Sequence, residues 1–244
     1  MNTRISRTIS AAAAMRLAQL SDATLPTGGF SFSCGLETAA AEGVVRDAAT
    51  LEEFVRDVVR QSQYTDLIAM LHARRAFAAG DYEALTAADR AAWMCKLNDE
   101  LRTMTSRMGR KLTELLLHLT DDSASGQPSA SLLGRWIDDI DGGRVRGTYP
   151  AAQGIAFATG GVEERAAAAS LLYGAAGVVT GAALRCLRVT HLDTQRILWR
   201  LSADADRLYD EVADATLDNI ENFSPQLDIL AALHEKGRTR MFMN

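Results

Sequence analysis

The feature of this sequence that most restricts its fold is a long run of apolar residues at helical spacing. Apolar side chains recur every three or four residues from Trp93 to Leu119, and this spacing places them along one face of an α-helix. No stretch between turn signals alternates apolar and polar residues, which is the pattern of a half-buried strand. The sequence therefore predicts an all-α protein.

Shorter segments with helical spacing occur along the rest of the chain. Thr50 and Glu53 have the spacing of a capping box and predict that a helix starts there. Apolar residues spread over 197–220 predict the last long helix, and Ser224-Pro225 predicts a short helix after it. These segments extend the all-α prediction to most of the chain.

The chain contains no convincing domain boundary. Residues 121–131 are rich in Asp, Ser and Gly and predict a loop, but helical segments lie on both sides of it. We therefore expect a single domain over residues 1–244, a bundle of about eight to ten helices. Its two ends, residues 1–14 and 236–244, are expected to be mobile.

One stretch raises the question of a membrane. Residues 166–184 contain no charged side chain over nineteen positions, which is close to the length of a membrane-spanning helix. Alanine and glycine dominate the stretch, however, and they contribute little transfer free energy. Gly174, Gly177 and Gly181 suit close approach of helices, which occurs in soluble cores as well as in membranes. We therefore predict a buried central helix and no membrane.

Composition narrows the class of protein. The 244 residues are 48% hydrophobic and 23% charged, as in soluble globular proteins. The net charge of −5 provides no basic excess for nucleic acid. The three cysteines are widely spaced and form no CxxC pair, which favours free thiols in a reducing compartment. We therefore predict a cytoplasmic protein that does not bind nucleic acid.

The segment Leu25 to Glu37 differs from the helical remainder. It contains one proline, three glycines and two phenylalanines in thirteen residues. Two adjacent glycines after Pro26-Thr27 predict a turn, and Ser31 or Ser33 is expected to cap a short helix that stops at Gly43. Aromatic residues at the head of a helix favour a contact surface. The alternative is that both phenylalanines point inward and the glycines serve only the turn.

The same segment fails as a catalytic motif. Gly29 to Ser33 is one residue short of the G-x-S-x-G nucleophile elbow, and no predicted strand precedes it. No G-K-[ST] follows Gly28-Gly29, as a phosphate-binding loop requires. We therefore expect no catalytic residue in this segment.

The histidines and cysteines leave one alternative function open. The histidines form no HxxxH or HExxH motif, so each is expected to be a surface or loop residue. We predict no metal ligand and no tightly bound cofactor. The alternative is a helical enzyme or regulator that uses Cys34 with a histidine brought near it by the fold. The histidines are His72, His118, His191 and His234.

Several segments together resemble the family of urease accessory proteins UreF. Leu25 to Glu37 is similar to that family's Pro-x-Gly-Gly-Phe-Ser-x-Ser-x-Gly-Leu-Glu segment. Arg102, Thr105 and Gly109 resemble its Arg-x-x-Ser/Thr-x-x-x-Gly helix, and Tyr149-Pro150 resembles its His-Tyr-Pro segment. The likeness covers roughly residues 15–244. It also has departures, since Thr148 stands where the family often has histidine, which weakens any role in passing a metal there.

The resemblance implies a non-catalytic, all-α, homodimeric scaffold. Such a protein binds a second accessory protein (UreD, also called UreH), and the two together recruit the GTPase UreG and engage apo-urease. Nickel would pass through this assembly, and GTP would be bound by the partner GTPase.

The resemblance also implies candidate partner-binding residues. The Gly-rich turn is the leading candidate for contact, and the tail from His234 to Asn244 resembles the segment that docks on the UreD-type partner. In that tail Arg240 and Phe242 would be the charged and the apolar anchor. For Arg185 and Arg188, at the end of the small-residue helix, a surface salt bridge is the alternative to a partner contact. The candidates are Phe30, Ser31, Ser33, Glu37, Arg102, Tyr149, Arg185, Arg188, Glu235, Arg240 and Phe242.

Overall fold

A computed structural model describes residues 9–120, 128–222, 224–235 and 241–242, and this part of the chain is helical with no strand. The all-α prediction is confirmed, with more helices than the eight to ten expected. They are α1 (Ala11–Ser21), α2 (Leu36–Ala41), α3 (Ala48–Ser62), α4 (Ile68–Ala79), α5 (Tyr82–Met94), α6 (Asp99–Thr120), α7 (Pro128–Asp141), α8 (Tyr149–Thr159), α9 (Glu164–Cys186), α10 (His191–Ser202), α11 (Ala205–Asp210) and α12 (Pro225–His234), with short 3-10 segments η1 (Gly29–Ser31) and η3 (Leu217–Asn219) and a π-helical segment η2 (Gln63–Leu67).

The ends of the chain lie partly outside the described residues. Of the predicted mobile segments, 1–8, 236–240 and 243–244 are not described, and the loop predicted over 121–131 is described only from residue 128. Within the N-terminal segment, α1 begins at Ala11 with the Ser10 hydroxyl accepting from Ala13 N–H at 3.1 Å. The single domain and its mobile ends stay predictions.

Helix α3 starts earlier than the sequence predicted. Asp47, not Thr50, occupies the N-cap position: its carboxylate accepts from the Thr50 N–H at 2.9 Å, and the Thr50 hydroxyl accepts from the Asp47 N–H at 3.1 Å. This is a capping box one turn before the one proposed with Glu53. The predicted start was wrong because the Asp47 carboxylate accepts from the backbone N–H of Thr50, which has no acceptor within the helix, so the helix begins at Ala48.

The long apolar run from Trp93 to Leu119 is two helices, not one. Helix α5 ends at Met94, and the Asn98 side chain accepts from the Leu101 N–H at 2.8 Å at the start of α6. The apolar stripe is also rotated relative to the core, since Leu119 is 48% exposed. The buried face of α6 includes small and polar residues, and it packs on α8. Its buried residues are Thr105, Met108, Gly109, Leu112, Thr113 and Leu116.

The second long helix predicted over 197–220 is also interrupted. Helix α10 ends at Ser202, α11 covers only Ala205–Asp210, and a 3-10 turn follows at Leu217–Asn219. Apolar spacing alone does not distinguish one helix from two that share a core, because both put the same side chains inward.

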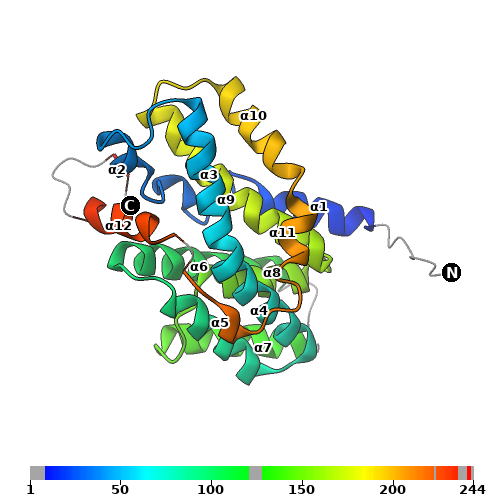
Figure 1. The fold of residues 1–244 in the computed structure, drawn as a ribbon. Coiled ribbons are helices and arrows are strands. Elements are labelled where there is room, and N and C mark those ends of the chain that lie inside the picture. The colour runs from blue at the N-terminus through cyan, green and yellow to red at the C-terminus, as the bar shows by residue number, and fades with distance from the viewer. Residues whose placement is uncertain (1–8, 121–127, 223, 236–240, 243–244) are drawn as a thin grey trace.

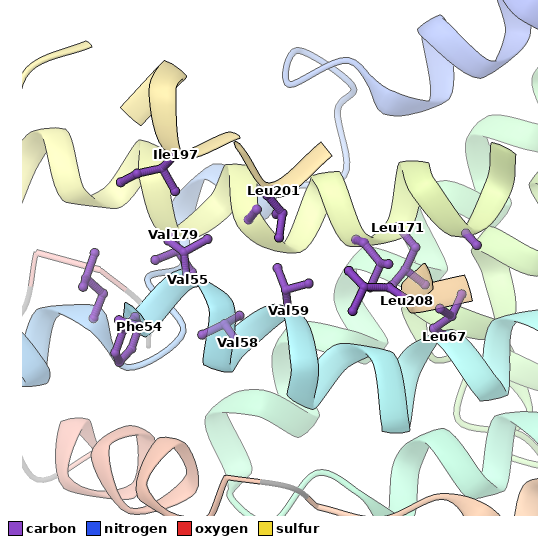
Figure 2. Packing of buried hydrophobic residues seen from close by; sticks show 14 of the residues in the cluster. Phe54, Val55, Val58, Val59, Leu67, Leu171, Val179, Ile197, Leu201 and Leu208 are labelled. Atoms are coloured by element: carbon purple, nitrogen blue, oxygen red, sulfur yellow. The ribbon is translucent and has the colours of Figure 1, made fainter. Parts of the chain in front are cut away.

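The core has two clusters, with α9 central to the larger one (Figure 1). Helices α3, α10 and α11 pack around α9, so that Val55, Ile197 and Leu208 point toward it (Figure 2). The smaller cluster lies between α4, α5, α6, α7 and α8 around the fully buried Trp136. By length and composition α9 could cross a membrane, but 56% of its apolar window is buried inside the molecule. This burial favours the predicted central helix.

Candidate functional site: the tail corner

The glycine-rich turn is built by glycines in the left-handed region. Gly28 has φ +88° just before η1, and Gly35 has φ +80° at the N-cap of α2. The prediction that Ser31 or Ser33 caps this helix is therefore wrong, since Gly35 holds the cap position without a side-chain hydrogen bond. Ser33 is buried with its hydroxyl 3.5 Å from the Glu37 N–H, and Ser31 is half-buried. The turn fixes the direction in which its aromatic residues point.

The two phenylalanines of the turn point in different directions. Phe32 is buried, with 4% of its surface exposed, whereas Phe30 is 73% exposed. Both sequence interpretations therefore hold in part: one ring anchors the turn and the other is presented at the surface. Phe30 is the aromatic side chain of this turn that a partner can reach.

Arg185, in the last turn of α9, joins the turn to the C-terminal tail. Its guanidinium carbon lies 4.1 Å from the ring centroid of Phe30 and 4.0 Å from that of Phe242, and its Nη2 donates to the Phe30 carbonyl at 3.0 Å. Stacking of guanidinium on aromatic faces is attractive. In the described part of the chain Arg185 therefore stacks on rings and forms no salt bridge, the alternative considered from sequence.

His234, the last residue of α12, lies between two carboxylates. Its Nε2 lies 3.0 Å from Glu37 Oε2 and its Nδ1 lies 2.8 Å from Glu100 Oε2, and the ring is buried. The expectation of a surface histidine is wrong here, because α12 packs this side chain against α2 and α6. Two carboxylate acceptors, one at each ring nitrogen, suit an imidazole that carries both N–H groups.

Glu37 connects the imidazole to the tail backbone. Its carboxylate accepts from the Met241 N–H at 2.8 Å and from the Phe242 N–H at 3.1 Å, in addition to His234. Partial burial pushes the pKa of Glu37 up, but the hydrogen bonds from Met241, His234 and Phe242 outweigh it, so the pKa lies below its usual value. We call the group formed by Phe30, Glu37, Arg185, His234 and Phe242 the tail corner.

The depressed pKa of Glu37 predicts a pH-dependent tail contact. A carboxyl group with a lowered folded pKa stabilises the contact above its unfolded pKa of about 4.5, and the contribution is lost as pH falls through the folded pKa. We expect the ring NMR signals of Phe242, which is buried, to change from packed to free shifts as pH falls below about 4.5. Glu37→Gln should weaken the contact at neutral pH and flatten this dependence. Phe242 ring signals that stay unchanged in both proteins, with helical circular dichroism intact, would contradict the assignment.

The structure places the other predicted partner residues at several points. Glu235 is near the tail corner, where its carboxylate accepts from the Glu100 N–H at 3.0 Å. Arg102 is half-buried, donates to the Lys96 carbonyl at 2.8 Å and lies over Trp93. Arg188 is exposed beyond α9, and Arg240 lies outside the described residues.

Tyr149 belongs to the core side of the molecule. Its ring packs against the smaller cluster, its N–H donates to the Thr105 hydroxyl at 3.0 Å, and its side chain hydrogen bonds with Thr27. Tyr149 therefore links Thr27, at the start of the glycine-rich turn, to α6 and α8. It is not part of the tail corner.

Known proteins agree with the resemblance seen in the sequence. The UreF family model matches residues 45–202. Urease accessory protein UreF 1 of Brucella melitensis biotype 1 is 43% identical over 230 residues, which cover 94% of this chain and 92% of that protein. Urease accessory protein UreF of Yersinia enterocolitica is 37% identical over 230 residues, covering 94% and 97%. This chain belongs to the UreF family.

The region matched by the UreF family model includes only part of the tail corner. Residues 45–202 run from just before α3 to the end of α10, so the model covers α9 and Arg185 but stops short of the glycine-rich turn and of α12. The alignments with the UreF relatives are longer, at 230 residues of this chain. Of the tail corner, Arg185 therefore lies inside the region matched by the family model, and Phe30, Glu37, His234 and Phe242 lie on the segments that flank it.

The alternative that uses Cys34 finds little support in this UreF chain. Burial raises the pKa of the Cys34 thiol to about 11, so the thiol is protonated at neutral pH and is a poor nucleophile. Within the described ranges no group of three or more His, Cys, Asp or Glu side chains is arranged to hold a metal ion. In the tail corner the two carboxylates bind opposite sides of the His234 ring rather than converge on one point.

The histidine at the centre of the tail corner was missed from sequence. Only its place next to Glu235, in a segment that resembles a docking tail, hinted at a role. Glu100 was missed too, because its partner His234 is 134 positions away. No local spacing relates such residues.

Proposed function

We propose that this chain is a non-catalytic scaffold for urease maturation that bridges a UreD/UreH-type accessory protein, a UreG-type GTPase and apo-urease. The names of its relatives, urease accessory proteins, support the role in maturation. The observation that carries the scaffold role is the tail corner, where Arg185 stacks between an exposed ring and a tail ring. Exposed aromatic residues supported by arginine are typical of residues that dominate binding energy.

In this proposal the tail corner is the docking site for the UreD/UreH-type protein. Phe30 inserts into the partner, and the tail held by Glu37 presents Met241, which is 60% exposed. The other candidate contacts, carried over from the family, are Ser31, Ser33, Arg102, Tyr149, Arg188, Glu235 and Arg240.

The rest of the assembly follows from the same proposal. The chain acts as a homodimer in the cytoplasm, consistent with three free cysteines in the described structure. It holds no metal or nucleotide tightly. Nickel passes through the assembled complex, and GTP is bound by the GTPase.

Phe30→Ala tests the proposal. Removing an exposed aromatic anchor is expected to weaken binding of the purified UreD/UreH-type protein about tenfold or more, while leaving the midpoint of thermal unfolding nearly unchanged. Binding is measured by biolayer interferometry and stability by circular dichroism. Leu119→Ala is the matched control, since Leu119 is also exposed, at 48%, and lies about 30 Å along α6 from its start.

Two outcomes would count against the proposal. Equal affinities for Phe30→Ala, Leu119→Ala and the unaltered chain would remove the tail corner from the docking surface. A folded, unaltered chain that binds none of the UreD/UreH-type protein, the GTPase and apo-urease would overturn the scaffold role itself.

A further inference from the structure

The imidazole of His234 is enclosed between two carboxylates from different helices. Only 3% of its side chain is exposed, and the side chains of Glu37 and Glu100 are 20% and 14% exposed. Nε2 lies 3.0 Å from Glu37 and Nδ1 lies 2.8 Å from Glu100. An ionised carboxylate can only accept a hydrogen bond, so both bonds form together only when each ring nitrogen carries a hydrogen. This arrangement therefore requires the cationic imidazole.

Loss of one ring proton would break this arrangement. A neutral imidazole has one N–H, and its other nitrogen is an acceptor. That nitrogen would face a carboxylate oxygen at hydrogen-bond distance, and a partly buried carboxylate would lose its donor, which is unfavourable. One carboxylate must then move away. The contact with Glu37 is the longer of the two and the Glu37 side chain is the more exposed, so we expect Glu37 to move.

Glu37 would carry the effect of this proton to the tail. Its Oε2 accepts from His234 and also from the Phe242 N–H at 3.1 Å, while its Oε1 accepts from the Met241 N–H at 2.8 Å. The Phe242 ring stacks on Arg185, beside the exposed ring of the glycine-rich turn. A displaced Glu37 releases both tail amides, so the Phe242 ring loses the backbone contacts that hold it against Arg185.

Other titratable and charged groups of the described residues surround α12, which packs beside α2 (Figure 1). They are Asp99 and Arg107 of α6, Glu235 after α12, Arg185 and Cys186 at the end of α9, and Asp228 of α12, which interacts with Lys96 of the Lys96–Asp66 ion pair. Burial and the Glu37 carboxylate raise the pKa of the Cys186 thiol, so it stays protonated near neutral pH. Carboxylates, arginines and lysines ordinarily change charge well away from neutrality. Imidazole is the side chain that ordinarily gains or loses a proton there.

We propose that His234 is a proton-dependent clamp: the tail stays docked, and the tail corner stays complete for the UreD/UreH-type protein, only while the imidazole carries both hydrogens. A rise in pH that removes one of them releases the tail and weakens partner binding. This regulation rests on the proposed scaffold role and concerns the same docking site. Because the Glu37 carboxyl releases the tail at low pH, docking is limited to an intermediate pH range.

The first test uses the purified full chain alone. The ring NMR signals of Phe242 and of the histidines are followed from about pH 6 to about pH 9. We expect Phe242 to change from packed to free shifts over the same pH range in which the His234 ring loses a proton. His234→Gln should weaken tail docking at every pH, because one side of the amide faces a carboxylate without a hydrogen to donate.

Glu100→Gln is the variant that separates the clamp from a merely structural contact. Its amide can donate to a bare Nδ1, while the remaining Nε2–H donates to Glu37. The tail should therefore stay docked across the whole pH range. His72→Gln is the matched control, since His72 Nε2 lies 2.8 Å from the Ala215 carbonyl, an acceptor that a neutral imidazole satisfies. It should leave the pH dependence unchanged, and circular dichroism checks the folding of each variant.

The second test measures binding of the purified UreD/UreH-type protein by biolayer interferometry over the same pH range. The affinity of the unaltered chain should fall about tenfold or more as His234 loses its proton, which is the expected effect of losing a hydrogen bond to a charged group. Glu100→Gln should remove most of this fall. The partner titrates identically in both experiments, so the difference between them belongs to this chain.

The two tests distinguish failure of the clamp from failure of the scaffold role. Phe242 signals that stay packed while His234 loses its proton, or a His234 ring that keeps both hydrogens up to about pH 9, would overturn the clamp and leave the scaffold role intact. Tail release that persists unchanged in Glu100→Gln would also overturn it. A tail that responds as expected, in a chain that binds none of the three partner proteins, would overturn the scaffold role instead.

Discussion

Replacing Gly109 with alanine is expected to lower the free energy of unfolding by about 3 kcal/mol or more, at the upper end of the cost of overpacking. A Cβ at this position of α6 would lie 2.6 Å from the carbonyl carbon of Thr148 and would also meet the carbonyl oxygen of Gly147. Both are backbone atoms of the turn before α8, so no side-chain rotation relieves the clash. The helix and the turn would have to separate.

That separation would break further contacts. One turn earlier on α6, the Thr105 hydroxyl accepts from the Tyr149 N–H at 3.0 Å, and the same face of α6 is packed on α8. Losing this close approach exposes an amide at the start of α8 and loosens the smaller core cluster. The midpoint of urea unfolding by circular dichroism measures the effect.

Gly134→Ala is the control for this prediction. Gly134 lies inside α7, and a Cβ there would meet nothing within 4 Å. The same substitution should therefore stabilise by about 0.5–1 kcal/mol through helix propensity alone. If Gly109→Ala unfolds within about 1 kcal/mol of the unaltered chain, the close crossing of α6 and the turn is not a constraint on the fold.

Asp89→Ala should be comparably damaging, by about 3–5 kcal/mol, since it leaves several buried backbone donors without an acceptor. The buried carboxylate of Asp89, on α5, accepts from the N–H groups of Arg146, Gly147 and Thr148 at 2.7, 3.3 and 2.7 Å. Thr148 is the N-cap of α8 but makes no side-chain cap of its own. The cap of α8 is thus supplied by a residue 59 positions earlier.

Asp81→Ala provides the comparison on the same helix. Asp81 is exposed and caps α5 through one hydrogen bond, from the Ala84 N–H at 2.9 Å. Losing a single exposed cap costs about 1 kcal/mol. Urea unfolding of the two variants side by side measures the difference, and an Asp89→Ala variant no less stable than Asp81→Ala would show that the turn finds other acceptors.

The contacts of Thr105 and Gly109 explain part of the family motif on α6. The Arg102-Thr105-Gly109 pattern was interpreted through the resemblance, with Arg102 as a partner contact. The structure adds a reason for the other two residues: Gly109 lets α6 approach the turn before α8, and Thr105 receives the first amide of that helix. Spacing along α6 shows that these residues share a face, but it does not show which segment covers the face.

Helix boundaries, too, are predicted only in part from the spacing of residues along the chain. The apolar spacing from Trp93 to Leu119 correctly predicts helix but not the break before Asp99, because the side chain that caps α6 is a lone asparagine. Likewise the cap of α3 was placed at Thr50 when Asp47 competes for the same amides. Several acceptors lie within reach of each helix start, and their energies differ by only a few tenths of a kcal/mol to about 1 kcal/mol.

Local spacing and composition were enough to establish an all-α fold, a buried central helix and a glycine-rich turn, because those depend on neighbours three or four positions away. The resemblance of short segments was enough to indicate the family. Only the tertiary structure decided that Phe30 faces outward while Phe32 is buried, and that His234 joins Glu37 to Glu100. The two contacts of His234 link residues up to 197 positions apart, and their geometry follows from how helices pack rather than from any periodicity in the chain.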